Sequence, residues 1–292
     1  MALAGDLKKK DAPMRLVDYP PQEPLSVLGR AYHDTVMARF PDVPFEEVAY
    51  GADPYQGLLI FPAEHPDGRV LLAFHGGGWT SGYKEWMGFM APAMTQAGIT
   101  FVAAGYRLAP SHLFPTGFDD CCAALARCSR EVGRFGGDAG CIYLGGHSAG
   151  GHYAALMAVR RDWQQPHGLS PDVVRGCLPM SGVYTFGEGS GLAVRPRFLG
   201  AVDTPDADAI ASRAGPLQNL AATPPPFLMS CATEDFPHLI MQAGAMLAAL
   251  QATGGDAALL TIPACDHFSA HLSAGDPNGL WARRALAFMA AR

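Results

Sequence analysis

The chain has 292 residues, of which 49% are apolar and 16% are charged, and its formal net charge is −6 at pH 7. A composition of this kind can bury a large core, which excludes an intrinsically disordered protein. The acidic balance, with no stripe of lysine and arginine between aromatic residues, argues against a nucleic-acid partner.

The N-terminal region is rich in proline and precedes the regular pattern of the chain. Its lysines follow a very short apolar stretch, whereas a secretory signal begins with basic residues and continues with a longer apolar segment. The sequence has no run of about 18 apolar residues that would predict a membrane span. We therefore expect a cytoplasmic protein that does not enter a membrane, with a first helix at residues 26–39.

Strand-like and helix-like segments then alternate along the chain. Continuous apolar runs, such as residues 69–74, are typical of strands covered on both faces. The predicted strands are residues 45–50, 56–61, 69–74, 99–104, 141–145, 173–180, 227–232 and 257–262. The later helices are predicted at residues 85–97, 117–135, 151–160, 241–253 and 280–292. This order predicts an α/β fold with a mostly parallel central sheet flanked by helices.

One interval interrupts the alternation. Residues 183–214 contain scattered glycine, serine and arginine, and we interpret them as an insertion near the active site. Together with an N-terminal extension at residues 1–44, this insertion is expected to form a small cap. The sequence contains no internal repeat and no linker, so we interpret residues 1–292 as a single domain.

The sequence Gly-His-Ser-Ala-Gly at residues 146–150 matches the G-x-S-x-G pattern of a nucleophile elbow. In such a turn the serine has a strained backbone between a strand and a helix, and flanking glycines avoid clashes. A chain rich in glycine and alanine can produce these letters by chance. Here, however, they follow a predicted strand and precede a helix of small residues, so we predict Ser148 as the nucleophile.

A triple-glycine run, His-Gly-Gly-Gly-Trp at residues 75–79, follows a predicted strand about seventy residues before the elbow. Attack on an ester or amide creates a tetrahedral oxyanion, which fixed backbone N–H groups stabilise. We predict that the N–H groups of Gly77, Gly78 and Ala149 form this oxyanion hole. The alternative for such a run is a phosphate-binding loop, but the spacings G-x-x-x-x-G-K-[ST] and G-x-G-x-x-G are absent here.

The nucleophile needs a histidine base that a carboxylate orients, and in this fold their chain order is serine, acid, histidine. Among the later histidines, only His267 directly follows the final predicted strand. Asp235, in the loop after the preceding strand, is the predicted acid, with Glu234 as the alternative. Asp266 is expected to have a structural role.

Metal and cofactor sites are not expected. His267 and His271 could share one helix face, but neither the glutamate of an H-E-x-x-H motif nor a third ligand accompanies them. The seven cysteines, with Cys121 and Cys122 adjacent, resemble neither a disulfide framework nor a zinc site. We expect most of them to be reduced packing residues.

Aromatic residues are candidates for the wall of an apolar substrate pocket, although they are also common in protein cores. The candidates are Trp79, Phe186, Phe198 and Phe236.

Three motifs in this order resemble the hormone-sensitive-lipase-like esterases. They are residues 75–79, Gly-Tyr-Arg-Leu-Ala-Pro at residues 105–110, and residues 146–150. The resemblance covers about residues 68–290. It implies the α/β-hydrolase fold, and it carries the triad roles to Ser148, Asp235 and His267 and the oxyanion-hole roles to Gly77, Gly78 and Ala149.

The C-terminal half departs from that family. Such esterases show an Asp-Pro-Leu-type acid loop and a His-Gly-Phe-type histidine loop, whereas this chain has Glu-Asp-Phe-Pro-His at residues 234–238 and Asp-His-Phe-Ser at residues 266–269. The second stretch is similar to that of kynurenine formamidase-like hydrolases, which cleave N-formyl aryl amides. The same similarity extends to Trp79, Lys84, residues 181–184 and, more weakly, Asp-Tyr-Pro-Pro at residues 18–21.

We therefore expect a serine hydrolase that acts on small-molecule carboxylic esters, aryl esters among them. Aryl-formamidase activity of the kynurenine formamidase type is the alternative reaction. Outside the enzymes, the alternative is a non-catalytic ligand-binding homologue, because a fold alone does not imply a function. The partner that we expect is a small-molecule substrate, and the chain can also form a homodimer.

Overall fold

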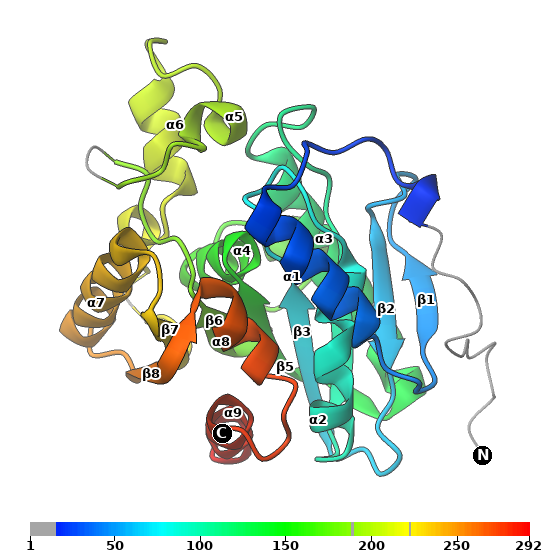
Figure 1. Ribbon diagram of the computed structural model, residues 1–292. Helices are drawn as coiled ribbons and strands as arrows, with labels where there is room; N and C mark the ends of the chain where they lie inside the picture. The colour runs from blue at the N-terminus through cyan, green and yellow to red at the C-terminus, as the bar shows by residue number, and fades with distance from the viewer. Residues whose placement is uncertain (1–15, 188–189, 222) are drawn as a thin grey trace.

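A computed structural model describes residues 16–187, 190–221 and 223–292 (Figure 1). Its eight-stranded sheet has the order β1-β2-β4-β3-β5-β6-β7-β8. The strands are β1 (Glu46–Ala49), β2 (Gly57–Phe61), β3 (Gly68–Phe74), β4 (Thr100–Ala104), β5 (Gly137–His147), β6 (Val174–Met180), β7 (Phe227–Glu234) and β8 (Ala257–Asp266). Strand β2 pairs antiparallel with β1 and β4, and every other pair is parallel. The predicted mostly parallel α/β sheet is confirmed.

Helices cover both faces of this sheet. One face packs against α3 (Thr116–Glu131), α4 (Ala149–Val159) and α7 (Pro237–Ala252). The other packs against α1 (Val27–Ala38), α2 (Ala91–Thr95), α8 (His267–Ser273) and α9 (Leu280–Ala290). Strand β3 shows why its sequence is a continuous apolar run: alternate side chains belong to opposite cores. Val70, Leu72 and Phe74 face one core, and Leu71 and Ala73 face the other.

The predicted helix at residues 85–97 differs from the observed structure. It consists of a 3₁₀ helix, η2 (Lys84–Met90), followed by the short helix α2. Proline lies at the start of α2, and Gly88 packs so closely on Phe40 that a Cβ at this glycine would come within 2.5 Å of the ring. The irregular 3₁₀ geometry therefore occurs where the backbone packs closely against Phe40. The hydrophobic periodicity of the sequence does not predict such a contact.

The central strands bring the two glycine-rich motifs together. Phe74, the last residue of β3, is in register with Gly146 of β5. The turn after β3 and the turn after β5 therefore leave the sheet side by side. In open α/β sheets, ligands bind at this edge, outside the carboxyl ends of the strands.

Two segments lie at the same end of the molecule as these turns (Figure 1). One comprises residues 16–26, before α1, and the other is the insertion, which contains α5 (Arg195–Leu199) and α6 (Ala207–Ala214). Residues 1–15 and 188–189 of the predicted cap lie outside the described residues. Within the part of the chain that the structure covers, no helix has both the length and the apolar character needed to cross a bilayer.

Candidate active site

Ser148 lies on a strained turn between β5 and α4. Its backbone has φ 54° and ψ −116°, a left-handed conformation that is costly for a residue with a side chain. The flanking glycines make the turn sterically possible. A Cβ at Gly146 would come within 2.5 Å of the Gly150 backbone, and a Cβ at Gly150 within 2.1 Å of the Phe74 carbonyl oxygen. Strain of this kind is typical of functional sites.

Replacing Gly150 by alanine is therefore expected to lower the free energy of unfolding by about 3 kcal/mol or more, because the Phe74 carbonyl cannot move out of the way without disturbing β3. Urea unfolding followed by circular dichroism measures this loss. Gly244→Ala, on an exposed face of α7 with no atom near the added carbon, is the control and should gain up to about 1 kcal/mol. Equal stabilities for the two variants would contradict the steric argument.

The turn after β3 forms a compact loop, here called the oxyanion loop (residues 75–82). Gly77 has φ 109° and Gly78 φ 61°, so both require conformations that favour glycine. The Gly77 carbonyl accepts hydrogen bonds from the Thr80 N–H at 3.2 Å, the Ser81 N–H at 3.1 Å and the Ser81 hydroxyl at 2.9 Å. Gly77 and Gly78 line the same cavity as Ser148.

His267 is the first residue of α8, and Asp266 caps this helix. The Asp266 side chain accepts the N–H groups of Phe268 and Ser269 at 3.1 and 2.7 Å. This capping fixes the backbone next to the imidazole, which agrees with the structural role expected for Asp266. The His267 Nδ1–H donates to Asp235 Oδ1 at 2.8 Å.

Asp235 follows β7, and its side chain is fully buried. It also accepts the Phe236 N–H at 2.8 Å and the Ser181 hydroxyl. Burial on its own would raise the pKa of this carboxyl, but His267, Ser181 and the Phe236 amide together lower it. The carboxylate is thus held ionised where it can orient an imidazole. Glu234, the alternative acid, is exposed at the end of β7.

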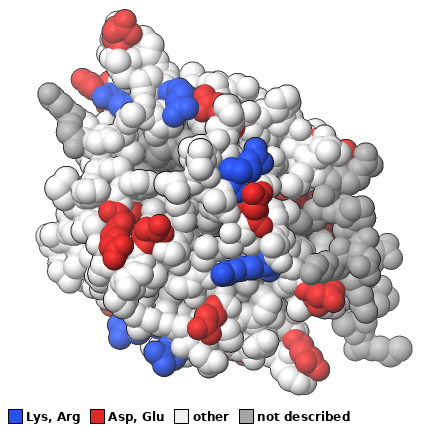
Figure 2. Space-filling model, in the orientation of Figure 1, with Lys and Arg blue, Asp and Glu red and all other residues white. Residues whose placement is uncertain are grey.

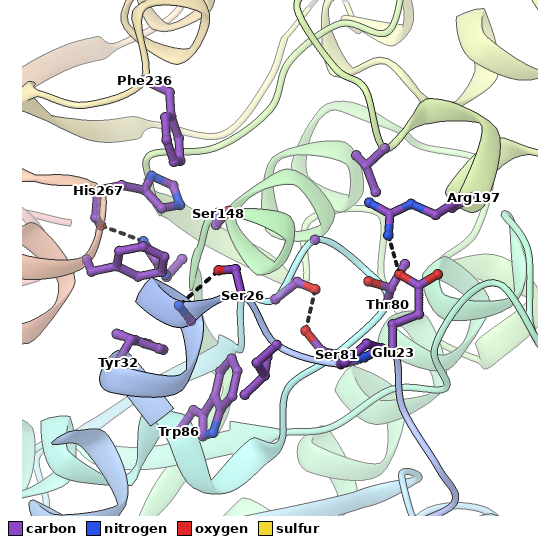
Figure 3. A pocket seen from close by; sticks show the side chains of 18 residues that line it. Glu23, Ser26, Tyr32, Thr80, Ser81, Trp86, Ser148, Arg197, Phe236 and His267 are labelled. Carbon is purple, nitrogen blue, oxygen red and sulfur yellow. Dashed lines mark hydrogen bonds and ion pairs between the residues drawn. The ribbon is translucent and has the colours of Figure 1, made fainter. Parts of the chain in front are cut away.

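A cavity of about 480 Å³ joins these groups (Figure 3). Ser148 and His267 lie in its wall, and Phe236 stands beside His267. Both cap segments contribute to it: an ion pair between Arg197 of α5 and Glu23 of the N-terminal chain closes one side. The other lining residues are Pro24, Leu25, Ser26, Gly29, Tyr32, Gly77, Gly78, Thr80, Ser81, Trp86, His147, Val194 and Phe268.

Three of the four aromatic residues predicted for the pocket wall lie elsewhere. Trp79, Phe186 and Phe198 are at most 2% exposed and pack together in the core, with the Trp79 and Phe198 rings stacked at 4.3 Å. Trp79 has φ 64°, and its indole N–H donates to His152 Nδ1 at 3.0 Å, so its ring is directed into the core. Only Phe236, 45% exposed, lines the cavity as expected.

Three further aromatic residues that line the cavity are not predicted from the sequence. They are Tyr32, Trp86 and Phe268. Phe268 follows the predicted base directly, which is a usable signal. Tyr32 and Trp86 come from helices on the opposite face of the sheet from α4, and no local pattern marks them.

Two further histidines, His147 and His271, lie close to His267. The His147 Nε2–H donates to the His267 carbonyl at 3.0 Å, and the His147 ring stacks on His271 at 4.4 Å. A hydrogen bond of 2.7 Å joins His271 Nδ1 to the Tyr32 hydroxyl. Burial and the neighbouring imidazoles lower the pKa of His147 well below its usual value, and lower the pKa of His271 to about 3. Both are therefore neutral supports. Among the described side chains, no group of three metal-ligating residues occurs.

The chain is similar to curated hydrolases. It is 31% identical to a kynurenine formamidase of Danio rerio over 47% of this chain and 45% of that protein. It is 35% identical to the carboxylesterase NlhH of Mycobacterium tuberculosis over 40% of this chain and 39% of that protein. These matches therefore span less than half the length of either relative. A longer match, to the esterase LipC of Mycobacterium tuberculosis, has 27% identity and covers 86% of this chain and 65% of that protein.

Solved structures agree with the fold. The carboxylesterase EstE1, cloned from a metagenomic library, superposes with a TM-score of 0.70 at 21% identity and covers 91% of this chain and 97% of its own. The family model described as the alpha/beta hydrolase fold matches residues 71–271, which include the oxyanion loop, the elbow and His267. The chain belongs to the α/β-hydrolase fold family.

Proposed function

We propose that this protein is a carboxylesterase-like serine hydrolase with Ser148 as nucleophile, His267 as base and Asp235 as acid. The observation that carries the proposal is the hydrogen bond that the buried Asp235 makes with Nδ1 of His267, a residue that lines the same cavity as Ser148. This bond leaves Nε2 of His267 as the nitrogen that can accept a proton.

The reaction follows from these positions. His267 Nε2 takes the Ser148 proton while the hydroxyl oxygen attacks the substrate carbonyl, and the N–H groups of Gly77, Gly78 and Ala149 stabilise the oxyanion. The tetrahedral intermediate then collapses, and the imidazolium gives its proton to the leaving alcohol. Water repeats the sequence on the acyl-enzyme and regenerates Ser148. Asp235 holds the ring in the required tautomer throughout.

Labelling with a fluorophosphonate probe tests the proposal. We expect one probe per chain, attached to the peptide that contains Ser148, together with hydrolysis of p-nitrophenyl acetate. A non-catalytic ligand-binding protein, the rival from outside the enzymes, would show neither. Labelling at another serine would also contradict the assignment.

A small or aryl substrate suits the cavity, which is bounded by Tyr32, Trp86 and Phe236. The second candidate reaction is hydrolysis of an N-formyl aryl amide. Two observations favour it: the curated relatives include kynurenine formamidases, and Glu23 and Arg197 present opposite charges to the cavity. A substrate with both an ammonium and a carboxylate group can engage both side chains.

Turnover of N-formylkynurenine should therefore fall about tenfold in Arg197→Gln, because a charge-assisted hydrogen bond is worth about 1.5–3 kcal/mol. Hydrolysis of neutral p-nitrophenyl acetate by the same variant should stay within about twofold, since a half-exposed ion pair contributes only about 1 kcal/mol or less to stability. Equal losses on both substrates would argue against charge recognition. Cytoplasmic location and a homodimer remain predictions.

A further inference from the structure

The oxyanion loop (residues 75–82) must keep a fixed shape although half of it is glycine. Its end folds back onto its start: a Cβ at Gly82 would come within 2.5 Å of both the Gly76 carbonyl oxygen and His75 Nδ1. Gly82, with φ 110°, therefore packs directly against the residues that precede Gly77 and Gly78. Whatever holds Gly82 also holds the start of the loop.

Gln22 contacts both backbone groups of Gly82. The Gln22 side-chain N–H donates to the Gly82 carbonyl at 2.9 Å, and the Gly82 N–H donates to Gln22 Oε1 at 2.9 Å. One residue later, the Glu23 N–H donates to the Thr80 carbonyl at 3.3 Å. These bonds run between segments about 60 residues apart, so they are tertiary contacts and not part of a local turn.

The segment that carries Gln22, here called the N-terminal strap (residues 19–26), is itself anchored at its start. The Tyr19 hydroxyl donates to both carboxylate oxygens of Glu85, at 2.9 and 3.0 Å. Glu85 also pairs with Lys84 at 3.0 Å, and both side chains are at most 3% exposed. The Tyr55 hydroxyl adds a bond to the Pro20 carbonyl at 3.1 Å. Tyr19 and Lys84 both belong to the stretches that resemble the formamidase-like hydrolases, and here they are in direct contact.

The other end of the strap is fixed as well. Ser26 caps α1 by accepting the Gly29 N–H at 3.1 Å. Helix α1 is joined to α8 through the bond between Tyr32 and His271, four residues after the catalytic base. The strap is therefore anchored at both ends. Between these anchors it lies beside the oxyanion loop, and Figure 3 shows Glu23 of the strap next to Thr80 and Ser81 of the loop.

We propose that the N-terminal strap is a positioning element of the oxyanion hole and acts through the paired hydrogen bonds of Gln22 with Gly82. The inference rests on the function proposed above. Gln22 does not line the cavity, so it has no direct part in binding substrate. Gln22 instead acts on the position of the Gly77 and Gly78 N–H groups. Stabilisation of an oxyanion depends on N–H groups that are held in place before the reaction, and a misplacement of about 1 Å can lower the rate by about 100-fold.

Gln22→Leu, which removes both hydrogen bonds at similar volume, is the test. We expect kcat for p-nitrophenyl acetate to fall between about tenfold and 100-fold while KM stays within about twofold, as for loss of an interaction made only in the transition state. Gln22→Glu keeps the acceptor for the Gly82 N–H and loses the donor, so it should fall between wild type and Gln22→Leu. Gln251→Leu, an exposed glutamine at the end of α7, is the control and should behave as wild type.

A trifluoromethyl ketone inhibitor separates positioning from a general loss of structure. Its adduct with Ser148 places an oxyanion in the hole, so its Ki should rise by the same factor by which kcat/KM falls. The concentration of active sites, titrated with the fluorophosphonate, should be unchanged. Unchanged kcat in Gln22→Leu, or a loss accounted for by fewer titratable sites with an unaltered Ki, would overturn the inference. Absence of esterase activity in the wild type would instead overturn the proposed function.

Discussion

Replacing Asp235 by asparagine is expected to lower kcat for p-nitrophenyl acetate by about 10⁴-fold, the loss typical of a triad that keeps its shape but holds the wrong histidine tautomer. The carboxylate now accepts the His267 Nδ1–H at 2.8 Å. An amide N–H at the same place would favour the proton on Nε2, which then could not accept the Ser148 proton. Steady-state kinetics measures the effect, and the rate of fluorophosphonate labelling should fall in parallel.

Glu234→Gln is the matched control, because it changes the neighbouring acid in the same way. Its side chain is exposed and lies at the end of β7, so kcat should stay within about twofold of wild type. If Glu234→Gln lost activity while Asp235→Asn kept it, the acid of the triad would be the glutamate. Similar folding of the two variants, shown by circular dichroism, makes the comparison direct.

Much of the fold followed from local signals. In β3 the continuous apolar run predicts burial on both faces, and alternate side chains of this strand do enter the two cores. The predicted ends of the strands were less accurate. Strand β5 extends over Gly137–His147, whereas the sequence predicts a strand only at residues 141–145. The first part of β5 is partly exposed and rich in glycine, so its pairing with β3 depends on a neighbour that periodicity cannot reveal.

The residues of the candidate site could be predicted from the sequence where the order of strands along the chain is enough to place them. Ser148, Asp235 and His267 each follow a strand of the parallel sheet, and such strands end at one edge. What could not be predicted depends on contacts between distant segments. Gln22 reaches Gly82 across 60 residues, and no pattern around either residue marks the pair.

The misplaced aromatic residues have the same explanation. The positive φ of Trp79 and its hydrogen bond to His152 turn the indole into the core, where Phe186 and Phe198 of the insertion cover it. A sequence reports that an aromatic residue stands next to a motif, but the backbone conformation decides to which side its ring points. The positions of Tyr32 and Trp86 are also decided by tertiary structure. Both belong to helices that pack on the other face of the sheet, and both line the cavity.

Mild acid is expected to unfold this protein, because four buried histidines are neutral in the folded state. Burial lowers the pKa of His75 and His152 to about 4 and of His271 to about 3, and lowers that of His147 well below its usual value. In the unfolded chain the same groups titrate near pH 6.5. Between these limits the unfolded state binds more protons, so the free energy of unfolding is fully retained above about pH 6.5 and falls as the pH drops below it.

The size of this effect is set by the number of protons. Each such histidine contributes up to about 1.4 kcal/mol per pH unit, so the four together contribute about 5 kcal/mol per unit near pH 5. A typical domain has about 5–15 kcal/mol in total, which places the acid transition between about pH 4 and 5.5. The carboxyl of Asp235 adds to the loss only at lower pH, because its folded pKa is below the unfolded value.

Calorimetric unfolding at pH 5 in buffers of different ionisation enthalpy gives the proton uptake directly, and we expect about four protons from these side chains. His271→Phe should lower the uptake by about one proton, although it also removes the bond to Tyr32 and will reduce stability at pH 7. An uptake of less than one proton in the wild type would contradict this account, because it would mean that these buried imidazoles are already charged in the folded protein.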